Sequence, residues 1–434
     1  MSESNAQTRI QGIKKTALGT VVTRLIGVAV QVAMVPLALG YLGTEKYGLW
    51  MAMASIIGFL HLSDLGVGNA VIAIVASKKA KESDMELRDF LSFSFFLLLK
   101  VSSVIFLLGI FTIFLIDWTH IFNSEDIILR SELNLAMLVL LGMFCFSMPL
   151  SIAQQVRLGL QEGHKNAIFN SVGQLLNLGL IYFVVKSELG LHWLIAASAI
   201  GTILAHFFNL CNLFLSFDFG SPVSNNLRSN HLPLLIRRGI GFFLIQISGL
   251  VAYQSDILIV SHFISPAEVT QYTVVLKYFS IPAIILSFFF VGLWPAYSDA
   301  IARGEKAWVI TYFWKSVCLA LVINFVCALF LLSLSSTLIG YWTNGLVKPS
   351  ATLLLSMFVW SLLTAIGGNI ATLLNGLSLL RLQVIVSTIS ALFNLMLSIF
   401  LVKILGVSGP VWSSNIVLII TYLILMWQIT RLFR

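Results

Sequence analysis

The stretch TALGTVVTRLIGVAVQVAMVPLALG, residues 16–40, decides what kind of fold this chain can form. Arg24 is its single charged residue. A helix needs about 20 mostly apolar residues to cross the hydrocarbon core of a bilayer, and this stretch is long enough. A second apolar run, residues 47–75, follows after a short turn. Residues 16–75 therefore predict two consecutive membrane spans.

Apolar runs of the same kind continue along all 434 residues. The chain is 58% hydrophobic and 10% charged, whereas a soluble protein has roughly 25% charged residues. We predict an all-α polytopic membrane protein with twelve transmembrane helices, at residues 16–40, 47–75, 90–116, 131–156, 167–185, 191–216, 239–262, 269–295, 309–335, 350–375, 382–402 and 409–430.

An internal repeat relates the two halves of the chain. Residues 159–186 align without a gap with residues 376–403, and the informative identities are Gly159 with Gly376, Asn177 with Asn394, and Lys186 with Lys403. The repeat predicts two six-helix lobes of the same orientation, as in parallel-repeat transporters. Their predicted bounds are 1–216 and 239–434, joined by a cytoplasmic linker at 217–238. Two such lobes can enclose a cavity and work by alternating access.

The basic residues predict the orientation. Most of the 26 Lys and Arg residues fall in the termini and in the even-numbered loops between the predicted spans. Cytoplasmic loops of membrane proteins have an excess of Lys and Arg. Both termini are therefore predicted to be cytoplasmic. The net charge of +8 is explained by this topology and predicts no nucleic-acid partner.

Four cations lie inside the predicted spans, where placing a charge is unfavourable by roughly 2.5–3.5 kcal/mol. Lys315 is close enough to the cytosolic edge for its long side chain to reach water, so three remain. Arg24 is about 12 Å into the first span, at about 1.5 Å per residue. Lys100 lies near the middle of the third span and Lys277 in the outer half of the eighth. Cations at stepped depths suit an anionic head group that moves through a central cavity. We therefore predict that all three bind the substrate.

Two carboxylates in the spans are open to two interpretations. Asp64 lies on the second span and could form an ion pair with Arg24. Asp256 lies on the seventh span and could form an ion pair with Lys277. Each carboxylate could also be an ion-coupling or gating site. A gating ion pair would satisfy both interpretations.

Uncharged polar residues recur at helical spacing within the spans. On the first span, Thr16, Thr20, Gly27 and Gln31 share one face with Arg24. A polar face avoids lipid, so it meets a cavity or another helix. We predict Gln31, Asn177 and Gln246 as polar residues of the cavity. The alternative is interhelical hydrogen bonding, worth about 1 kcal/mol for each bond.

Three segments near the N-terminus resemble motifs of bacterial lipid-linked polysaccharide flippases. TRLIG at residues 23–27 is similar to their [ST]-R-x-x-G element. YLGTEKYGLW at 41–50 resembles their short outer turn, and DLGVGNA at 64–70 resembles the end of their second span. The chain thus resembles the polysaccharide-transport branch of the multidrug/oligosaccharidyl-lipid/polysaccharide exporter (MOP) superfamily, close to the Wzx-type O-antigen flippases.

The resemblance implies a V-shaped, two-lobed transporter in the bacterial inner membrane. It implies that the protein moves undecaprenyl-pyrophosphate-linked oligosaccharide, such as an O-antigen repeat unit for lipopolysaccharide, from the cytoplasmic to the periplasmic leaflet, and that Arg24 binds the pyrophosphate. Polysaccharide polymerase and chain-length machinery are expected as partners. The sequence has no Walker A motif. A proton or sodium gradient is therefore the expected driving force, with Asp64 and Asp256 as coupling sites and with no cofactor or metal.

Two other functions remain open from the sequence. One is a cation-coupled multidrug or small-solute antiporter of the same superfamily, which would favour an acidic rather than a cationic cavity. The other is an integral-membrane glycan polymerase or transferase. Such enzymes typically have a long outer loop or an exposed acidic motif with a catalytic Arg or His. We expect no such catalytic motif in the outer loops near 117–130 and 336–349, which favours a transporter over an enzyme.

Overall fold

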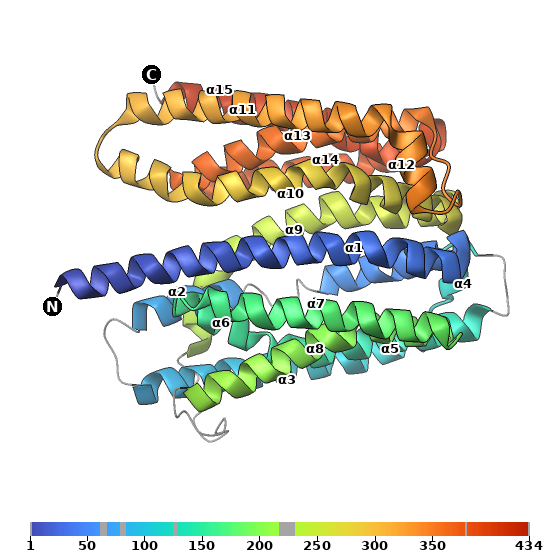
Figure 1. Cartoon of the computed structure of the whole chain (residues 1–434), viewed down its shortest axis with the longest axis horizontal. Coiled ribbons are helices and arrows are strands. Elements are labelled where there is room, and N and C mark those ends of the chain that lie inside the picture. The colour runs from blue at the N-terminus through green and yellow to red at the C-terminus, as the bar shows by residue number, and fades with distance from the viewer. Residues whose placement is uncertain are drawn as a thin grey trace. The chain divides into compact units, whose positions relative to one another are not determined.

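The computed structural model describes residues 2–60, 67–78, 84–124, 129–216, 231–377 and 380–432, and within these ranges all regular elements are helices. The helices that contain the first six predicted spans are α1 (Ser2–Leu60), α2 (Val67–Lys78), α3 (Asp84–Leu115), α5 (Leu129–Leu150), α6 (Ile152–Gly159), α7 (Gly163–Lys186) and α8 (Leu191–Ser216). Those that contain the last six are α9 (His231–Phe263), α10 (Pro266–Ala302), α11 (Lys306–Ser333), α13 (Ala351–Gly376), α14 (Leu380–Leu405) and α15 (Gly409–Leu432). Two short helices, α4 (Trp118–Ile121) and α12 (Ser335–Trp342), lie between spans (Figure 1).

The described helices match the predicted spans closely. Nine of the helical stretches among the described residues are long and apolar enough to cross a membrane. Two of them extend over more than one predicted span: Leu18–Leu60 covers the first span and the beginning of the second, and Leu382–Arg431 contains the last two. The first is divided at Gly43, whose φ of 72° and ψ of 178° are not helical. Only a residue without a Cβ adopts such a conformation readily, so Gly43 turns the chain between the first two spans.

Helices also extend beyond the predicted spans. The helix α9 begins at His231, so the last part of the predicted linker 217–238 is helical. Its remainder, residues 217–230, lies outside the described residues. The hydropathy of a sequence marks where a helix can enter lipid, whereas the helix itself can continue into water. The helix α9 therefore begins before the apolar residues that predict its membrane span.

The described residues group into two compact units. Unit 1 comprises Met1–Tyr41, Ile57–Thr119 and Glu125–Phe243, and unit 2 comprises Leu42–Ile56, His120–Ser124 and Leu244–Arg434. Each unit contains most of one half of the chain. The outer turn after the first span, together with residues 120–124, groups with unit 2 although it precedes residue 216.

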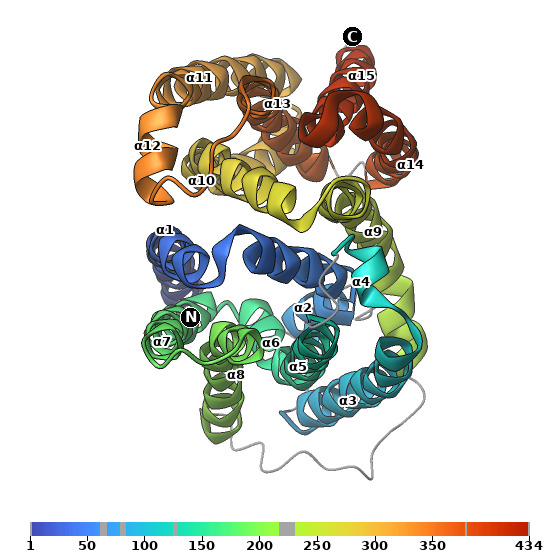
Figure 2. The ribbon, with the colours of Figure 1, turned by 90° about the vertical axis from the view of Figure 1, so that its right-hand side faces the viewer.

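The helices of the two units pair in the same way. In unit 1, α2 packs on α6, α3 on α5, and α8 on both α5 and α7. In unit 2, α10 packs on α13, α11 on α13, and α15 on both α13 and α14 (Figure 2). In both units the second predicted span of that half packs on the fourth, and the third also packs on the fourth. The sixth predicted span packs on both the fourth and the fifth. The internal repeat of the sequence is thus a repeat of helix packing.

A pair of repeated glycines marks the equivalent contact in each unit. A Cβ built on Gly159, at the end of α6, would lie 2.8 Å from the Cβ of Val75 on α2. A Cβ on Gly376, at the end of α13, would lie 2.9 Å from the Cβ of Tyr297 on α10. Real side chains do not approach this closely, so each glycine permits close helix packing.

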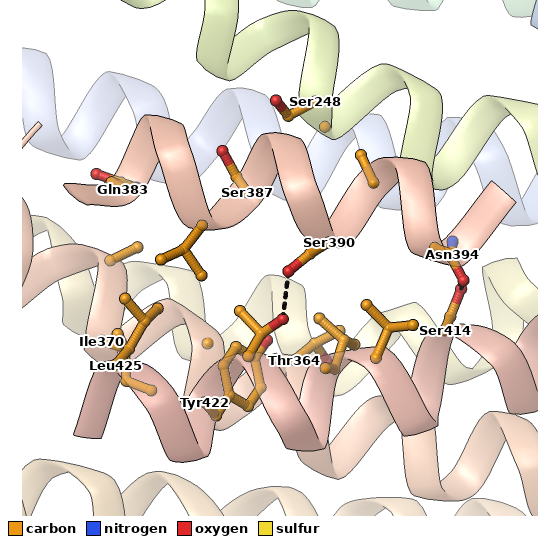
Figure 3. A pocket seen from close by; sticks show the side chains of 18 of the residues that line it. Ser248, Thr364, Ile370, Gln383, Ser387, Ser390, Asn394, Ser414, Tyr422 and Leu425 are labelled. Atoms are coloured by element: carbon orange, nitrogen blue, oxygen red, sulfur yellow. Dashed lines mark hydrogen bonds between the residues drawn. The ribbon is translucent and has the colours of Figure 1, made fainter. Parts of the chain in front are cut away.

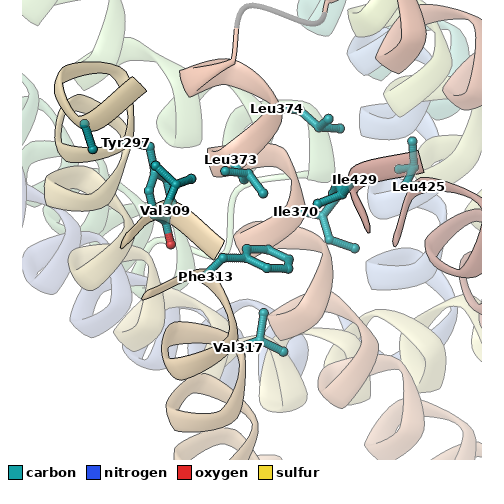
Figure 4. Close-up of a cluster of buried hydrophobic side chains, with 10 residues drawn as sticks. Tyr297, Val309, Phe313, Val317, Ile370, Leu373, Leu374, Leu425 and Ile429 are labelled. Atoms are coloured by element: carbon teal, nitrogen blue, oxygen red, sulfur yellow. The ribbon is translucent and has the colours of Figure 1, made fainter. Parts of the chain in front are cut away.

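A buried apolar cluster holds four helices of unit 2 together. Its members come from α10, α11, α13 and α15 and include Phe313, Leu373 and Ile429 (Figure 4). Phe313 and Leu373 are fully buried. This packing holds α10 and α15 in place, the helices that carry Tyr272 and Ser414.

Candidate functional site

Arg24 occupies a distinct face of α1. Leu18, Val22, Leu25 and Val32 form an exposed apolar stripe on this helix, with Leu18 67% exposed. At about 100° per residue, Arg24 lies roughly 120° around the helix from the centre of that stripe. Its side chain is exposed. Exposed apolar stripes are suited to lipid, so Arg24 is exposed on a side of the helix other than the lipid-suited one.

A third face of α1 packs on α7 and fixes the rotation of the first helix. The Thr23 hydroxyl donates to the Ala167 carbonyl at 3.0 Å and lies 3.1 Å from the Ser171 hydroxyl. At Gly27, a Cβ would lie 2.9 Å from Oε1 of Gln174. The contact explains why a threonine and a glycine flank Arg24 at this spacing. Gln31, one turn after Gly27, is half-buried.

Lys277 interacts with the outer turn of the first helix pair, within unit 2. Its ammonium donates to the Tyr47 hydroxyl at 2.8 Å and lies 5.4 Å from the centre of the Tyr47 ring. The Sδ atom of Met51 is 3.7 Å from the same nitrogen. A hydroxyl and a ring face satisfy an ammonium group without neutralising its charge. Lys277 therefore remains a positive centre.

The segment at residues 41–50 is built to approach α10. The Thr270 hydroxyl donates to the Thr44 carbonyl at 2.5 Å. A Cβ on Gly48 would lie 1.7 Å from the carbonyl oxygen of Pro266. Gly43 supplies the turn, Gly48 the close approach and Tyr47 the contact with Lys277. The motif that resembles the flippase outer turn is thus a packing motif against the start of α10.

Asp256 is buried, with 2% of its surface exposed, and is surrounded by hydroxyl groups. Ser398 of α14 donates to Oδ1 at 3.0 Å, while Ser414 of α15 and Tyr272 of α10 donate to Oδ2 at 3.2 and 3.3 Å. The described residues place no cation within ion-pair distance of this carboxylate, and Lys277 instead contacts Tyr47, so of the two interpretations the ion pair is not the one that the described residues form. Asp64, the other predicted carboxylate, lies outside the described residues.

Lys100 has a different setting from Arg24. It is exposed on α3 at one end of a stripe made of Val104, Leu107, Leu108 and Phe111, whose members are 55–67% exposed. At about 100° per residue, Lys100 lies within the width of this stripe. Long cationic side chains on a lipid-facing surface can extend towards the membrane interface. The surroundings of Lys100 are those of a lipid-facing side chain.

The predicted uncharged residues differ in their contacts. Asn177 is buried, donates to the Thr202 hydroxyl at 2.9 Å and accepts from the Gly201 amide at 2.6 Å. It therefore makes the interhelical hydrogen bonds that were the alternative to a cavity role. Gln246 on α9 is half-buried, and its Oε1 has no hydrogen-bond partner among the described residues.

A buried arginine in unit 1 was missed by the sequence analysis. Arg157 at the end of α6 is fully buried and forms an ion pair of 2.9 Å with Glu162. Its guanidinium also donates to Asn209 at 2.5 Å and to Asn212 at 2.6 Å, both on α8. The sequence placed Arg157 in a cytoplasmic loop because it follows the fourth predicted span. The polar residues Asn209 and Asn212 near the end of an apolar helix were the available signal.

Comparison with known proteins identifies relatives in sequence and in fold. Residues 10–301 match the family model described as polysaccharide biosynthesis protein. A protein of Salmonella typhimurium described as "Putative O-antigen transporter" is 23% identical over 291 residues, which is 66% of this chain. The chain spans 65% of that relative's length, slightly under two thirds.

Two solved structures have the same fold over nearly the whole chain. An inward-facing multidrug resistance transporter of the MATE family and MOP superfamily matches with a TM-score of 0.77 and 13% identity, over 95% of this chain and 98% of that one. The lipid II flippase MurJ, in an inward closed conformation, matches with a TM-score of 0.74 and 16% identity, over 96% and 87%. The predicted fold class is confirmed.

Proposed function

The chain belongs to the family of polysaccharide biosynthesis proteins, and we propose that it is a transporter that moves a lipid-linked oligosaccharide across the bacterial inner membrane. In this proposal the substrate is an undecaprenyl-pyrophosphate-linked repeat unit, moved from the cytoplasmic to the periplasmic leaflet by alternating access of two lobes, 1–216 and 239–434. The family match and the similarity to an O-antigen transporter support this substrate class. Both termini are proposed to be cytoplasmic.

Arg24 is the residue that we assign to the pyrophosphate. A guanidinium group presents a planar fork of donors that can bind two phosphate oxygens at once, which an ammonium group cannot do. The observation that supports the assignment is its position on α1, exposed but away from the lipid-suited stripe. Since its neighbours Thr23 and Gly27 fix the rotation of the helix, the guanidinium direction is set by packing.

Lys277 is proposed as a second anion-binding cation. Tyr47 positions its ammonium through the hydrogen bond and the ring contact, and its positive charge is retained. A pyrophosphate or an acidic sugar could replace the Tyr47 hydroxyl as a stronger acceptor, since hydrogen bonds between ionised groups are about twice as strong as neutral ones.

Asp256 is proposed as the site that couples transport to a cation gradient. A carboxylate ringed by Ser398, Ser414 and Tyr272 offers several oxygen atoms to a small cation. Oxygen ligands of this kind suit a sodium ion, and the carboxylate alone suits a proton. Among the described residues three hydroxyls and no cation contact this carboxylate, which leaves its charge for a sodium ion or a proton to balance.

The function is tested in a strain that lacks the gene, complemented with single variants. Arg24→Ala should abolish surface polysaccharide, because losing a hydrogen bond to a charged group weakens binding by roughly 1.5–3 kcal/mol, about 10- to 100-fold. Arg24→Lys should restore it only in part. Arg303→Ala, which removes an exposed ion pair with Asp299, is the control and should be active. Membrane abundance is measured by immunoblot. Full activity of Arg24→Ala would remove the pyrophosphate assignment.

Loss of protein together with activity in Arg24→Ala would instead favour a structural pair with Asp64. The double variant Asp64→Ala/Arg24→Ala separates the two cases. If the pair is structural, removing both charges should restore abundance without restoring surface polysaccharide. If Arg24 acts on the substrate, the abundance of the single variant is already normal.

A further inference from the structure

A polar stripe follows one face of α14 and ends at Asp256. Its members are Gln383, Ser387, Ser390, Asn394 and Ser398. Their spacing of three and four residues places them on a single side of the helix, over a length of about 22 Å at about 1.5 Å per residue. The last member, Ser398, donates to the Asp256 carboxylate. The opposite face of α14 is apolar and exposed, and it includes Ile389 and Met396.

Four members of the stripe, Gln383, Ser387, Ser390 and Asn394, line a cavity inside unit 2. This cavity has a volume of about 360 Å³, is bordered by α9, α13, α14 and α15 and is partly open, and most of its lining is apolar. Figure 3 shows Gln383, Ser387, Ser390 and Asn394 along one side of it. The Ser390 hydroxyl lies 2.6 Å from the Thr421 hydroxyl of α15, drawn there as a dashed line. The hydroxyls of Ser248 on α9 and Thr364 on α13 complete the polar lining.

One end of the cavity lies a single hydroxyl away from Asp256. Asn394 and Ser414 line the cavity, and the Asn394 amide donates to the Ser414 hydroxyl at 3.3 Å. The Ser414 hydroxyl in turn donates to Asp256 at 3.2 Å. A cation or proton at this end of the cavity would therefore be one residue from the carboxylate.

The other end lies near the start of α14, which the loop charges place on the cytosolic side. Gln383 lines the cavity there, and its Oε1 is buried without a hydrogen-bond partner among the described residues. Buried polar atoms are normally bonded to protein or to ordered water. Gly249 also lines the cavity, and a Cβ built on it meets no atom within 4 Å. There is space and there are polar partners for several water molecules, each of about 30 Å³.

We propose that this cavity is a hydrated pathway through which the coupling cation reaches Asp256 from the cytosolic side. The inference rests on the proposed coupling role of Asp256. Hydroxyl and amide groups at intervals of one helical turn can bind a sodium ion or a chain of water molecules. A cavity lined only by apolar groups would stay dry. The competing occupant is a segment of the isoprenoid carrier, which would fill the cavity and exclude water.

The test is chemical labelling of single cysteines and needs no transport. The native Cys145, Cys211, Cys318 and Cys327 are replaced by alanine, and Ser390→Cys or Ile389→Cys is added. A membrane-impermeant cationic methanethiosulfonate is applied to the cytosolic face of inside-out vesicles. Ser390→Cys should react at least about tenfold faster than Ile389→Cys, because only a hydrated thiol ionises readily to the reactive thiolate. Ile389 is the matched control, since it is 63% exposed and adjacent in sequence.

A second substitution tests whether the labelled cysteine reacts from within this cavity. Gly249→Val adds a side chain into the open space and should slow the labelling of Ser390→Cys. Gly179→Val, at another helical glycine whose Cβ would meet no atom within 4 Å, should leave the labelling unchanged.

The pathway is overturned by any of three results: no reaction of Ser390→Cys with the impermeant reagent, reaction only from the periplasmic face, or labelling that is insensitive to Gly249→Val. If Ser390→Cys reacts only with a lipid-soluble maleimide, the occupant is an acyl or isoprenoid chain. Normal labelling in a protein that does not transport oligosaccharide would leave the pathway standing and refute the proposed substrate instead.

Discussion

Asn177 and Asn394, which the sequence repeat aligns, each bind two consecutive residues of the helix that follows. Asn177 on α7 contacts Gly201 and Thr202 of α8, and Asn394 on α14 contacts Ser413 and Ser414 of α15. The two bonds fix the same helix pair in each unit. In unit 2, the second partner, Ser414, also donates to Asp256. In unit 1 the asparagine contact thus joins two helices, whereas in unit 2 the same contact also includes a hydroxyl that bonds a carboxylate.

Removing the charge of Asp256 should uncouple transport from its driving gradient. In Asp256→Asn the amide oxygen can still accept from one hydroxyl, such as that of Ser398, and the amide nitrogen can donate to the oxygen of Ser414 once that hydroxyl turns, so the protein should fold. Loss of the charge removes the attraction for a cation. We expect the rate in proteoliposomes to become independent of an imposed sodium or proton gradient, at normal abundance. Ser398→Ala should weaken the dependence less. A gradient response in Asp256→Asn equal to that of the wild type would exclude this coupling site.

Arg157 should be required for stability rather than for transport. Removing one partner of a buried ion pair costs about 3–5 kcal/mol, because the other groups remain buried and unpaired. Arg157→Ala should therefore lower the melting temperature in detergent and the abundance in the membrane. Arg303→Ala, whose ion pair with Asp299 is exposed, should change neither by much. Equal stability of the two variants would refute the structural role.

Gly48 should not tolerate even a methyl group. The Cβ of Gly48→Ala would lie 1.7 Å from the backbone oxygen of Pro266, so the outer turn and α10 would have to separate. Overpacking of this kind costs typically 1–3 kcal/mol and occasionally more. Gly40→Ala is the control, because its Cβ meets no atom within 4 Å. Thermal unfolding in detergent compares them, and a shift at Gly48 no larger than that at Gly40 would contradict the packing.

Lys100 should be much less sensitive to substitution than Arg24. Its exposed apolar neighbours place it on a lipid-suited face of α3. Lys100→Leu continues that face and should retain surface polysaccharide to within about twofold, since surface substitutions usually change stability by less than 0.5 kcal/mol. Quantitative immunoblots of surface polysaccharide give the comparison. A loss of surface polysaccharide as large as that of Arg24→Ala would instead support the substrate-binding role that the sequence predicted for Lys100.

The span pattern and the repeat could be predicted because lipid restricts the sequence strongly. Long apolar runs such as 16–40 have few alternatives to a helix. The repeat predicted that the two halves correspond, and Gly159 and Gly376 lie at the equivalent helix contact of each unit. The surroundings of charges could not be predicted in the same way. Arg157 looked like a loop cation because its partners, Asn209 and Asn212, come from another helix. The hydroxyl shell of Asp256 comes from three other helices, and two of them, α14 and α15, are distant in sequence.

The surroundings of the three cations deeper in the spans could not be predicted from the sequence either. Depth along a helix can be counted from the sequence, and it gave Arg24, Lys100 and Lys277 one common role. The face of the helix depends on which neighbours are buried. The exposed stripe around Lys100 and the contact of Lys277 with Tyr47 required the packed structure.

The central claim, that this protein moves a lipid-linked oligosaccharide across a bilayer, is tested most directly by measuring the leaflet in which that lipid resides. Lipid-linked oligosaccharide from the deletion strain is reconstituted with purified protein in proteoliposomes. Its outer-leaflet fraction is measured by periodate oxidation of the glycan before and after a cation gradient is applied. The account predicts that wild-type protein changes this fraction, that Arg24→Ala does not, and that protein-free vesicles do not. An unchanged fraction with folded wild-type protein, or an equal change with Arg24→Ala, would contradict it.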